Sequence, residues 1–101
     1  MTQLDPEDDK LAILARSARA RTGSDDGAAV RDDIGRTYAA ANVALPSLAL
    51  TALQAAVAAA ISSGSSKFEA AVVITAASEL GADDRALIAD IGNPTVHVVA
   101  V

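Results

Sequence analysis

The stretch NVALPSLALTALQAAVAAAISSG, residues Asn42–Gly64, decides how this chain folds. It lies within a run free of charged residues, Thr37–Ser66, and alanine dominates its middle. Pro46 cannot lie inside a helix but is well placed just before one, and Ser47 is a suitable N-cap because its hydroxyl can accept a free backbone N–H. We therefore predict a helix that begins after Ser47 and is closed by Gly64, which can adopt the left-handed conformation.

The apolar side chains of this helix recur three and four residues apart, so they share one helical face. Alanine fills most other positions, which leaves no wide polar face, and we expect the helix to be buried on several sides. The residues expected on its main buried face are Leu50, Leu53, Val57 and Ile61. A chain of 101 residues is long enough for one domain, so we predict a single domain over residues 1–101 with this helix at its centre.

The composition argues against nucleic-acid and membrane partners. A net charge of −5 leaves no basic footprint for nucleic acid. The uncharged run approaches the roughly 20 residues that a membrane span needs, but Pro46 and several polar residues interrupt it. The acidic segment LDPEDD near the start is unlike a signal peptide, so we expect a cytoplasmic protein. Cysteine is absent, and His97 is the single histidine.

The segment before the central helix predicts a helix and then a hairpin. Asp5-Pro6-Glu7 combines an N-cap residue, a proline at the first helical position and an acid in the first turn. The segments Ala28–Val30 and Arg36–Ala41 then flank Asp32-Asp33-Ile34-Gly35, and this pattern is typical of a β-hairpin whose acids form the turn rather than a metal site. The stripe expected to be buried on the first helix is Leu11, Leu14, Ala15 and Ala18.

Strand and helix alternate in the second half of the chain. Phe68–Thr75 contains an apolar run typical of a strand buried on both faces. Gly81–Asp90 is predicted to be a short helix terminated by Gly92, and Thr95–Val101 a last strand. The predicted order is α-β-β-α-β-α-β, which implies an α/β fold with a mixed sheet covered by helices.

The sequence LAILARSARARTG, followed by GAAVRDDIGRTYAAANVA and an alanine-rich helix, resembles the small cytidine deaminases. The residues that match the family's strand pattern are Gly27, Ala28, Ala29, Tyr38, Asn42 and Val43. The similarity covers roughly Leu11 to Ile74. It implies a three-layer α/β/α sandwich with a mixed sheet. A second fold compatible with the hairpin is a dimerisation module of the roadblock type, which fits the second half of the chain less well.

The resemblance fails at the residues that carry the family's chemistry. A zinc nucleoside deaminase needs three Cys or His ligands and a glutamate that moves protons. Two registers of the first motif are open: one places Leu53 and Ala55 at the ligand and the glutamate, and the other places Thr51 and Leu53 there. The second motif falls near Leu80–Asp84, without a cysteine. A lone histidine is more often structural than metal-binding, so we expect His97 to hold no zinc.

The family's sugar-binding pattern is retained only in part. Asn42 is kept, but Ala44 and Leu45 replace the glutamate and the second asparagine that the resemblance implies. An Asn42 that bonds nearby backbone at the strand end is the simpler interpretation. The residues that could still bind a ligand in the old pocket are Asn42, Thr51 and Gln54, and we expect no catalytic residues, no metal and no cofactor.

Three functions fit these observations. We favour a non-catalytic homologue that serves as an oligomeric structural or interaction module. The alternatives are a sensor that binds a nucleoside or nucleotide in the vestigial pocket, and a divergent, metal-independent hydrolase, for which we find no nucleophile paired with a base. One sheet and two short helices cannot cover the whole alanine-rich helix, and exposed apolar patches usually mark interfaces, so we expect a homodimer or homotetramer.

Overall fold

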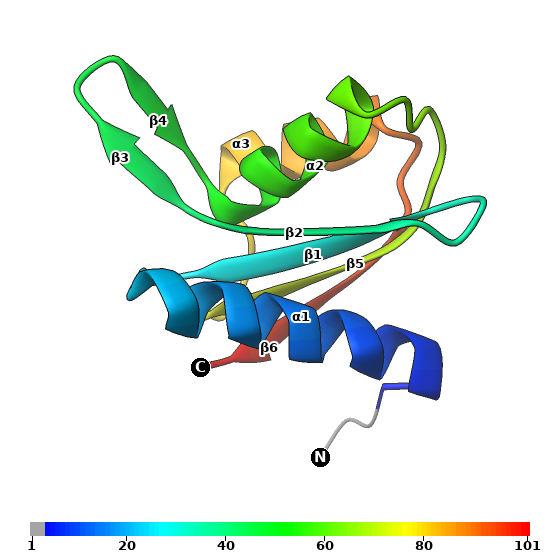
Figure 1. The fold of residues 1–101 in the computed structure, drawn as a ribbon, viewed down its shortest axis with the longest axis horizontal. Helices are drawn as coiled ribbons and strands as arrows, with labels where there is room; N and C mark the ends of the chain where they lie inside the picture. Colours follow the sequence, from blue (N-terminus) through cyan, green and yellow to red (C-terminus); the bar gives the residue numbers. More distant parts are fainter. Residues whose placement is uncertain (1–3) are drawn as a thin grey trace.

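A mixed sheet separates one long helix from two shorter ones in the computed structural model, which describes residues 4–101 (Figure 1). The elements in chain order are α1 (Pro6–Thr22), β1 (Gly27–Asp32), β2 (Thr37–Ala41), β3 (Val43–Leu45), β4 (Leu48–Leu50), α2 (Ala52–Ser62), β5 (Phe68–Thr75), α3 (Ala82–Asp90) and β6 (Thr95–Ala100). The four-stranded sheet has the order β2-β1-β5-β6, in which only the pair β5–β6 is parallel. Helix α1 covers one face and α2 covers the other, so the predicted mixed sheet between helices is confirmed.

Helix α1 begins as its sequence predicts. The side chain of Asp5 accepts a hydrogen bond of 2.9 Å from the backbone N–H of Asp8, and Pro6 occupies the first turn. The predicted buried stripe is confirmed at Leu11 and at two alanines but is wrong at Leu14, which is 37% exposed. Ala12 is buried instead, at 1% exposure, beside Leu11 and Ala15 in the core on this side of the sheet.

The start of the central helix differs from the prediction. Helix α2 begins at Ala52 with Thr51 as its N-cap, and Ser47 caps nothing. Thr51 and Gln54 form a capping box in which each side chain accepts a hydrogen bond from the other residue's backbone N–H. The residues before it form the hairpin β3–β4, with Pro46 and Ser47 in the tight turn. Proline is favoured at the second position of a turn as well as at the start of a helix, so Pro46 is compatible with both. The capping box of Thr51 and Gln54 determines that the helix starts at Ala52.

The core on the α2 side of the sheet consists largely of alanine and valine. Leu53 and Val57 point into it as predicted and are 0% and 2% exposed. The prediction is wrong at Ile61, which is 51% exposed, and at Leu50, which lies on β4 outside the helix. Three alanines complete the buried face of α2, so the helix approaches the sheet closely: Ala52, Ala56 and Ala60.

The remaining elements follow their predicted positions. Strand β5 is buried from Ala70 to Thr75, as its apolar run predicts. Helix α3 is followed by Gly92, whose φ of 90° is the left-handed conformation that glycine favours. Strand β6 is one of the sheet's two edge strands and is only half-buried. Within residues 4–101, no helix combines the length and apolar character needed to cross a membrane.

The turn between β1 and β2 is organised by Asp32, whose side chain is completely buried. Its carboxylate accepts hydrogen bonds from the backbone N–H groups of Ile34 and Arg36, from the Arg36 side chain at 2.7 Å and from the Ser65 hydroxyl at 2.7 Å. Burial acts to raise the pKa of Asp32, but these hydrogen bonds outweigh it and lower the pKa from 3.8 to about 2. The prediction that this acid forms the turn is confirmed.

Candidate functional site

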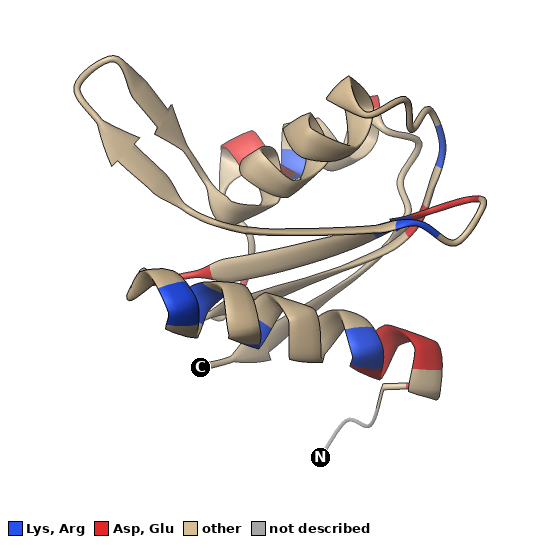
Figure 2. Ribbon diagram, in the orientation of Figure 1, with Lys and Arg blue, Asp and Glu red and all other residues tan. Residues whose placement is uncertain are grey.

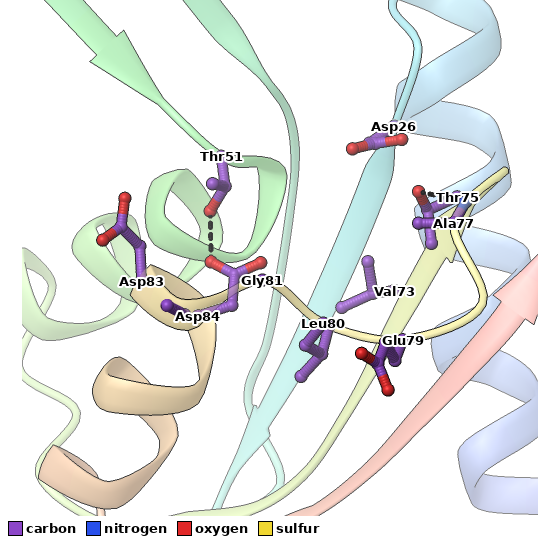
Figure 3. A pocket seen from close by; sticks show the side chains of 11 residues that line it. Asp26, Thr51, Val73, Thr75, Ala77, Glu79, Leu80, Gly81, Asp83 and Asp84 are labelled. Carbon is purple, nitrogen blue, oxygen red and sulfur yellow. Dashed lines mark hydrogen bonds between the residues drawn. The ribbon is translucent and has the colours of Figure 1, made fainter.

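A cavity of about 300 Å³ lies where strand β5 ends and helices α2 and α3 begin (Figure 3). Thr51 at the start of α2 and the segment from Leu80 to Asp84 at the start of α3 form one wall. Val73 and Thr75 form the floor, because alternate residues of a strand point to the same face. The cavity therefore joins the two helix starts that the resemblance to cytidine deaminases singled out in the sequence.

A short hydrogen bond ties the two helix starts together. The hydroxyl of Thr51 donates to Asp84 Oδ1 at 2.6 Å, and Asp84 is only 8% exposed (Figure 3). The same hydroxyl accepts the backbone N–H of Gln54, so its one donor hydrogen is used and one of its two acceptor positions is filled. Asp84 belongs to the first turn of α3, where the helix dipole favours a negative charge.

The cavity is acidic. Four carboxylates line it, and neither lysine nor arginine does: Asp26, Glu79, Asp83 and Asp84. A phosphate group in this cavity would face several negative charges with no basic partner among the lining residues. The arrangement suits an uncharged or cationic small molecule better than a nucleotide.

The three residues predicted to bind a ligand each use a side-chain oxygen for a hydrogen bond inside the protein. Asn42 Oδ1 accepts a hydrogen bond of 3.0 Å from the backbone N–H of Asp26, as the simpler interpretation of this residue expects. Gln54 closes the capping box, and Thr51 bonds Asp84. Of the three, only Thr51 lines the cavity. Their role in ligand binding stays a prediction.

The cavity is not filled by the leucines of the central stretch. Leu53 is completely buried in the core between α2 and the sheet, and Leu50 is half-buried on β4. Neither lines the cavity. Its volume of about 300 Å³ lies at the lower limit of small-molecule pockets.

His97 belongs to a chain of polar side-chain contacts on the other face of the sheet. Its Nε2 lies 2.9 Å from Asp8 Oδ2, and Asp8 also receives a hydrogen bond of 2.9 Å from Arg31, which in turn bonds Glu69. Burial acts to raise the pKa of Asp8, but the hydrogen bonds from Arg31 and His97 outweigh it and hold that pKa below its ordinary value. The single histidine therefore links β6 to α1 and does not face the cavity.

Comparison with known proteins identifies the family of this chain. The family described as cytidine deaminase-like matches residues 4–101. This chain belongs to the cytidine deaminase-like family. No curated protein sequence is significantly similar to it.

Three solved structures illustrate the shared fold. Cytidine deaminase from Burkholderia pseudomallei superposes with a TM-score of 0.78 at 23% identity, over 100% of this chain and 87% of that one. The enzyme from Mycobacterium leprae gives 0.74 at 23% identity, over 95% and 87% of the two chains. A mutant cytidine deaminase from Mycobacterium tuberculosis gives 0.71 at 25% identity, over 95% and 85%. At these identities the likeness shows the fold, the predicted α/β sandwich of the family.

The residues of this cytidine deaminase-like chain do not fit the zinc ion that the resemblance implies. Zinc in such sites takes thiolate and imidazole ligands, and the chain has no cysteine. Its one imidazole is held by Asp8 on the α1 side of the sheet. In the part of the chain that the structure describes, no group of three or more His, Cys, Asp or Glu side chains is placed to hold a metal ion.

The family pattern places its second motif at Leu80–Asp84, and this segment lines the cavity. The sequence does not predict that Asp84 within it bonds Thr51. Asp84 gave no separate signal, because an acid in a first helical turn is common. Its partner Thr51 is an N-cap residue in the structure, whereas Ser47 was predicted to fill that role.

Proposed function

We propose that this chain is a non-catalytic member of the cytidine deaminase-like family that acts as an interaction module and assembles with itself. The observation that carries the proposal is the Thr51–Asp84 hydrogen bond. It joins the starts of α2 and α3 with a hydroxyl and a carboxylate, at the place where the resemblance calls for metal ligands and a proton-shuttling glutamate.

The donor set supports this proposal on chemical grounds. A hydrolytic zinc site needs ligands that hold the zinc ion, because the zinc lowers the pKa of a bound water, and carboxylates alone suit Mg²⁺ or Ca²⁺ better than such a zinc. Neither register of the first motif supplies a Cys or His ligand or an acid, because one places Leu53 and Ala55 at these positions and the other places Thr51 and Leu53 there. Two side chains that could bind a nucleoside accept backbone hydrogen bonds instead. Asn42 accepts one from Asp26, and Gln54 accepts one from Thr51.

A second candidate function is the binding of a small molecule, and the cavity itself favours it. Its volume can hold a compact ligand, and its acidic lining selects an uncharged or cationic one over a nucleotide. Calorimetric titration with cytidine and with cytidine monophosphate would separate the cases. Binding of the nucleoside alone would support a sensor, and no heat from either compound would favour the interaction module.

The proposed lack of catalysis is tested by two measurements on the purified chain. We expect elemental analysis to find no stoichiometric zinc and an ammonia assay with cytidine or deoxycytidine to match the buffer control. The variant Glu79→Gln serves as the matched control, because it changes an exposed carboxylate of the cavity lining and leaves both helix starts in place. Ammonia release by the wild type that Glu79→Gln abolishes would overturn the proposal.

A further inference from the structure

Strand β6 has a free edge that lies beside an open groove. It pairs with β5 along one side, and within residues 4–101 no strand pairs along its other side. A groove of about 1160 Å³ lies between this strand and the flank of α1 that carries Asp9, Ala12 and Arg16. The groove is open because α1 packs mainly against β1, β2 and β5. A free strand edge and an open space beside it together leave room for another strand.

The sequence of β6 lacks the usual protection against an added strand. Natural edge strands commonly carry a lysine, a proline or a bulge that prevents pairing with another chain. Thr95–Ala100 includes neither of these residue types, and its register with β5 is regular over all six pairs. The other edge strand, β2, packs against both α1 and α2. The free edge of β6 therefore presents backbone N–H and C=O groups that a strand from outside can pair with.

The charges beside the groove describe the strand that fits it. Asp9 and Arg16 are exposed where α1 lines the groove, about 10 Å apart along the helix axis. The ion pairs that α1 forms among the described residues use Glu7, Asp8 and Lys10, which leaves the other two side chains available. Strand β6 carries no acid, lysine or arginine (Figure 2). A complementary strand has a base beside Asp9, an acid beside Arg16 and uncharged residues elsewhere.

We infer that the free edge of β6 binds an extended segment of another protein, which adds to the sheet as an antiparallel fifth strand. Antiparallel pairing is slightly more stable per residue than parallel pairing. Because α1 and β6 run toward the same end of the molecule, it places the acid before the base in the partner sequence (Figure 1). A second copy does not fit, since its β6 has neither charge and two chains of net charge −5 repel each other. This contact goes beyond the proposed self-assembly and does not depend on it.

The pleat of a strand sets the spacing of the partner's charges. Side chains four residues apart lie on one face, about 13 Å from each other, which is close to the separation of Asp9 and Arg16. Strand β6 alternates in the same way: His97 and Val99 lie on the α1 side, and Val96 packs on the α2 side. The fitting segment therefore has an acid and, four residues later, a base on the α1 side, with β-branched residues on the opposite side.

The probe is the synthetic peptide VEVTVKV, which has this order and spacing, added to the full chain. We expect calorimetric titration to detect binding. Amide hydrogen exchange should become slower at alternate residues of Thr95–Ala100, whose N–H groups face the free edge, and should stay unchanged in β2. Two further peptides are methylated on one or the other alternate set of backbone nitrogens. Only one of the two should lose binding, because a paired strand turns every second N–H toward its neighbour.

A charge variant tests the choice of partner. Asp9→Asn/Arg16→Gln should bind VEVTVKV at least about fivefold more weakly than the wild type does, and should bind the uncharged peptide VQVTVQV equally well. Its circular dichroism spectrum should match the wild type, since both side chains are exposed.

Four results would overturn the inference: no binding of VEVTVKV, slower exchange in β2 rather than β6, equal affinity of the charge variant and the wild type, or protection of the β6 edge in the peptide-free protein that disappears on dilution. The last result would assign the edge to a second copy. The first three leave the proposed function standing, because that function is tested by the zinc, ammonia and light-scattering measurements.

Discussion

Replacing Thr51 with valine should destabilise the fold by an amount that the structure allows one to work out. The substitution removes the N-cap of α2, a loss of about 1 kcal/mol. It also removes the hydrogen bond to the carboxylate of Asp84, and bonds to charged groups contribute about 1.5–3 kcal/mol. Because water in the cavity can hydrate the unpaired carboxylate of Asp84, we expect less than the sum of about 2.5–4 kcal/mol, namely about 2–3 kcal/mol in the free energy of unfolding.

Thermal and denaturant unfolding followed by circular dichroism measure this change. For a domain of this size, about 2–3 kcal/mol corresponds to a fall of about 10–20 °C in the unfolding temperature. Thr51→Ser is the matched control, because serine keeps both the cap and the donor, and it should unfold within a few degrees of the wild type. Asp84→Ala leaves the cap of α2 in place and should lose less, about 1–2 kcal/mol.

A double-mutant cycle between Thr51→Val and Asp84→Ala tests the reasoning directly. If the hydrogen bond joins the helix starts, the double variant should be more stable than the sum of the single changes predicts, by about 1 kcal/mol. Changes that add to within about 0.3 kcal/mol would refute it, since independent sites behave in that way. The cap alone would then explain the effect of Thr51.

Three further predictions concern packing, a close approach and acid stability. Ala56→Glu places a charge in a completely buried position and should unfold the protein, whereas Ala59→Glu lies on the exposed face and should keep the unfolding temperature but weaken assembly in light scattering. Gly27→Ala should cost at least about 2 kcal/mol in denaturant unfolding, because the added Cβ would collide with the carbonyl oxygen of Ala15 where α1 crosses β1. Because folding lowers the pKa of Asp32 from 3.8 to about 2, its carboxylate stabilises the fold fully above pH 3.8, and this stabilisation is lost as the pH falls toward about 2. The variant Asp32→Asn should therefore be less stable than the wild type at neutral pH but lose less stability on acidification. An equal acid sensitivity of Asp32→Asn and the wild type would contradict that assignment.

The sequence predicted the order of the sheet strands and their helices because those elements have strong local signals. The N-cap Asp5, the turn around Asp32 and the apolar run of β5 each depend on neighbours in the chain, and each was confirmed. Gly92 likewise ended α3 as expected.

The start of the central helix was mispredicted because two local signals compete there. Pro46-Ser47 suits both a helix start and a tight turn, and the choice depends on the pairing of Leu45 with Leu48 and on the capping box four residues later. An alanine-rich segment also has no clear polar face, so its helical periodicity did not reveal that Ile61 is exposed. Candidate site residues were harder still, because the Thr51–Asp84 bond joins residues 33 positions apart.

The contact between Asp8 and His97 has a consequence for the order in which the chain can mature. These residues are 89 positions apart, so the first helix can complete its set of ion pairs only after the last strand has been synthesised. Until then, β5 lacks a neighbouring strand along the edge that later pairs with β6, where Val72 lies opposite His97. Contacts of such long sequence separation form slowly. During translation, the nascent protein therefore carries an unprotected strand edge until residues 95–100 have left the ribosome.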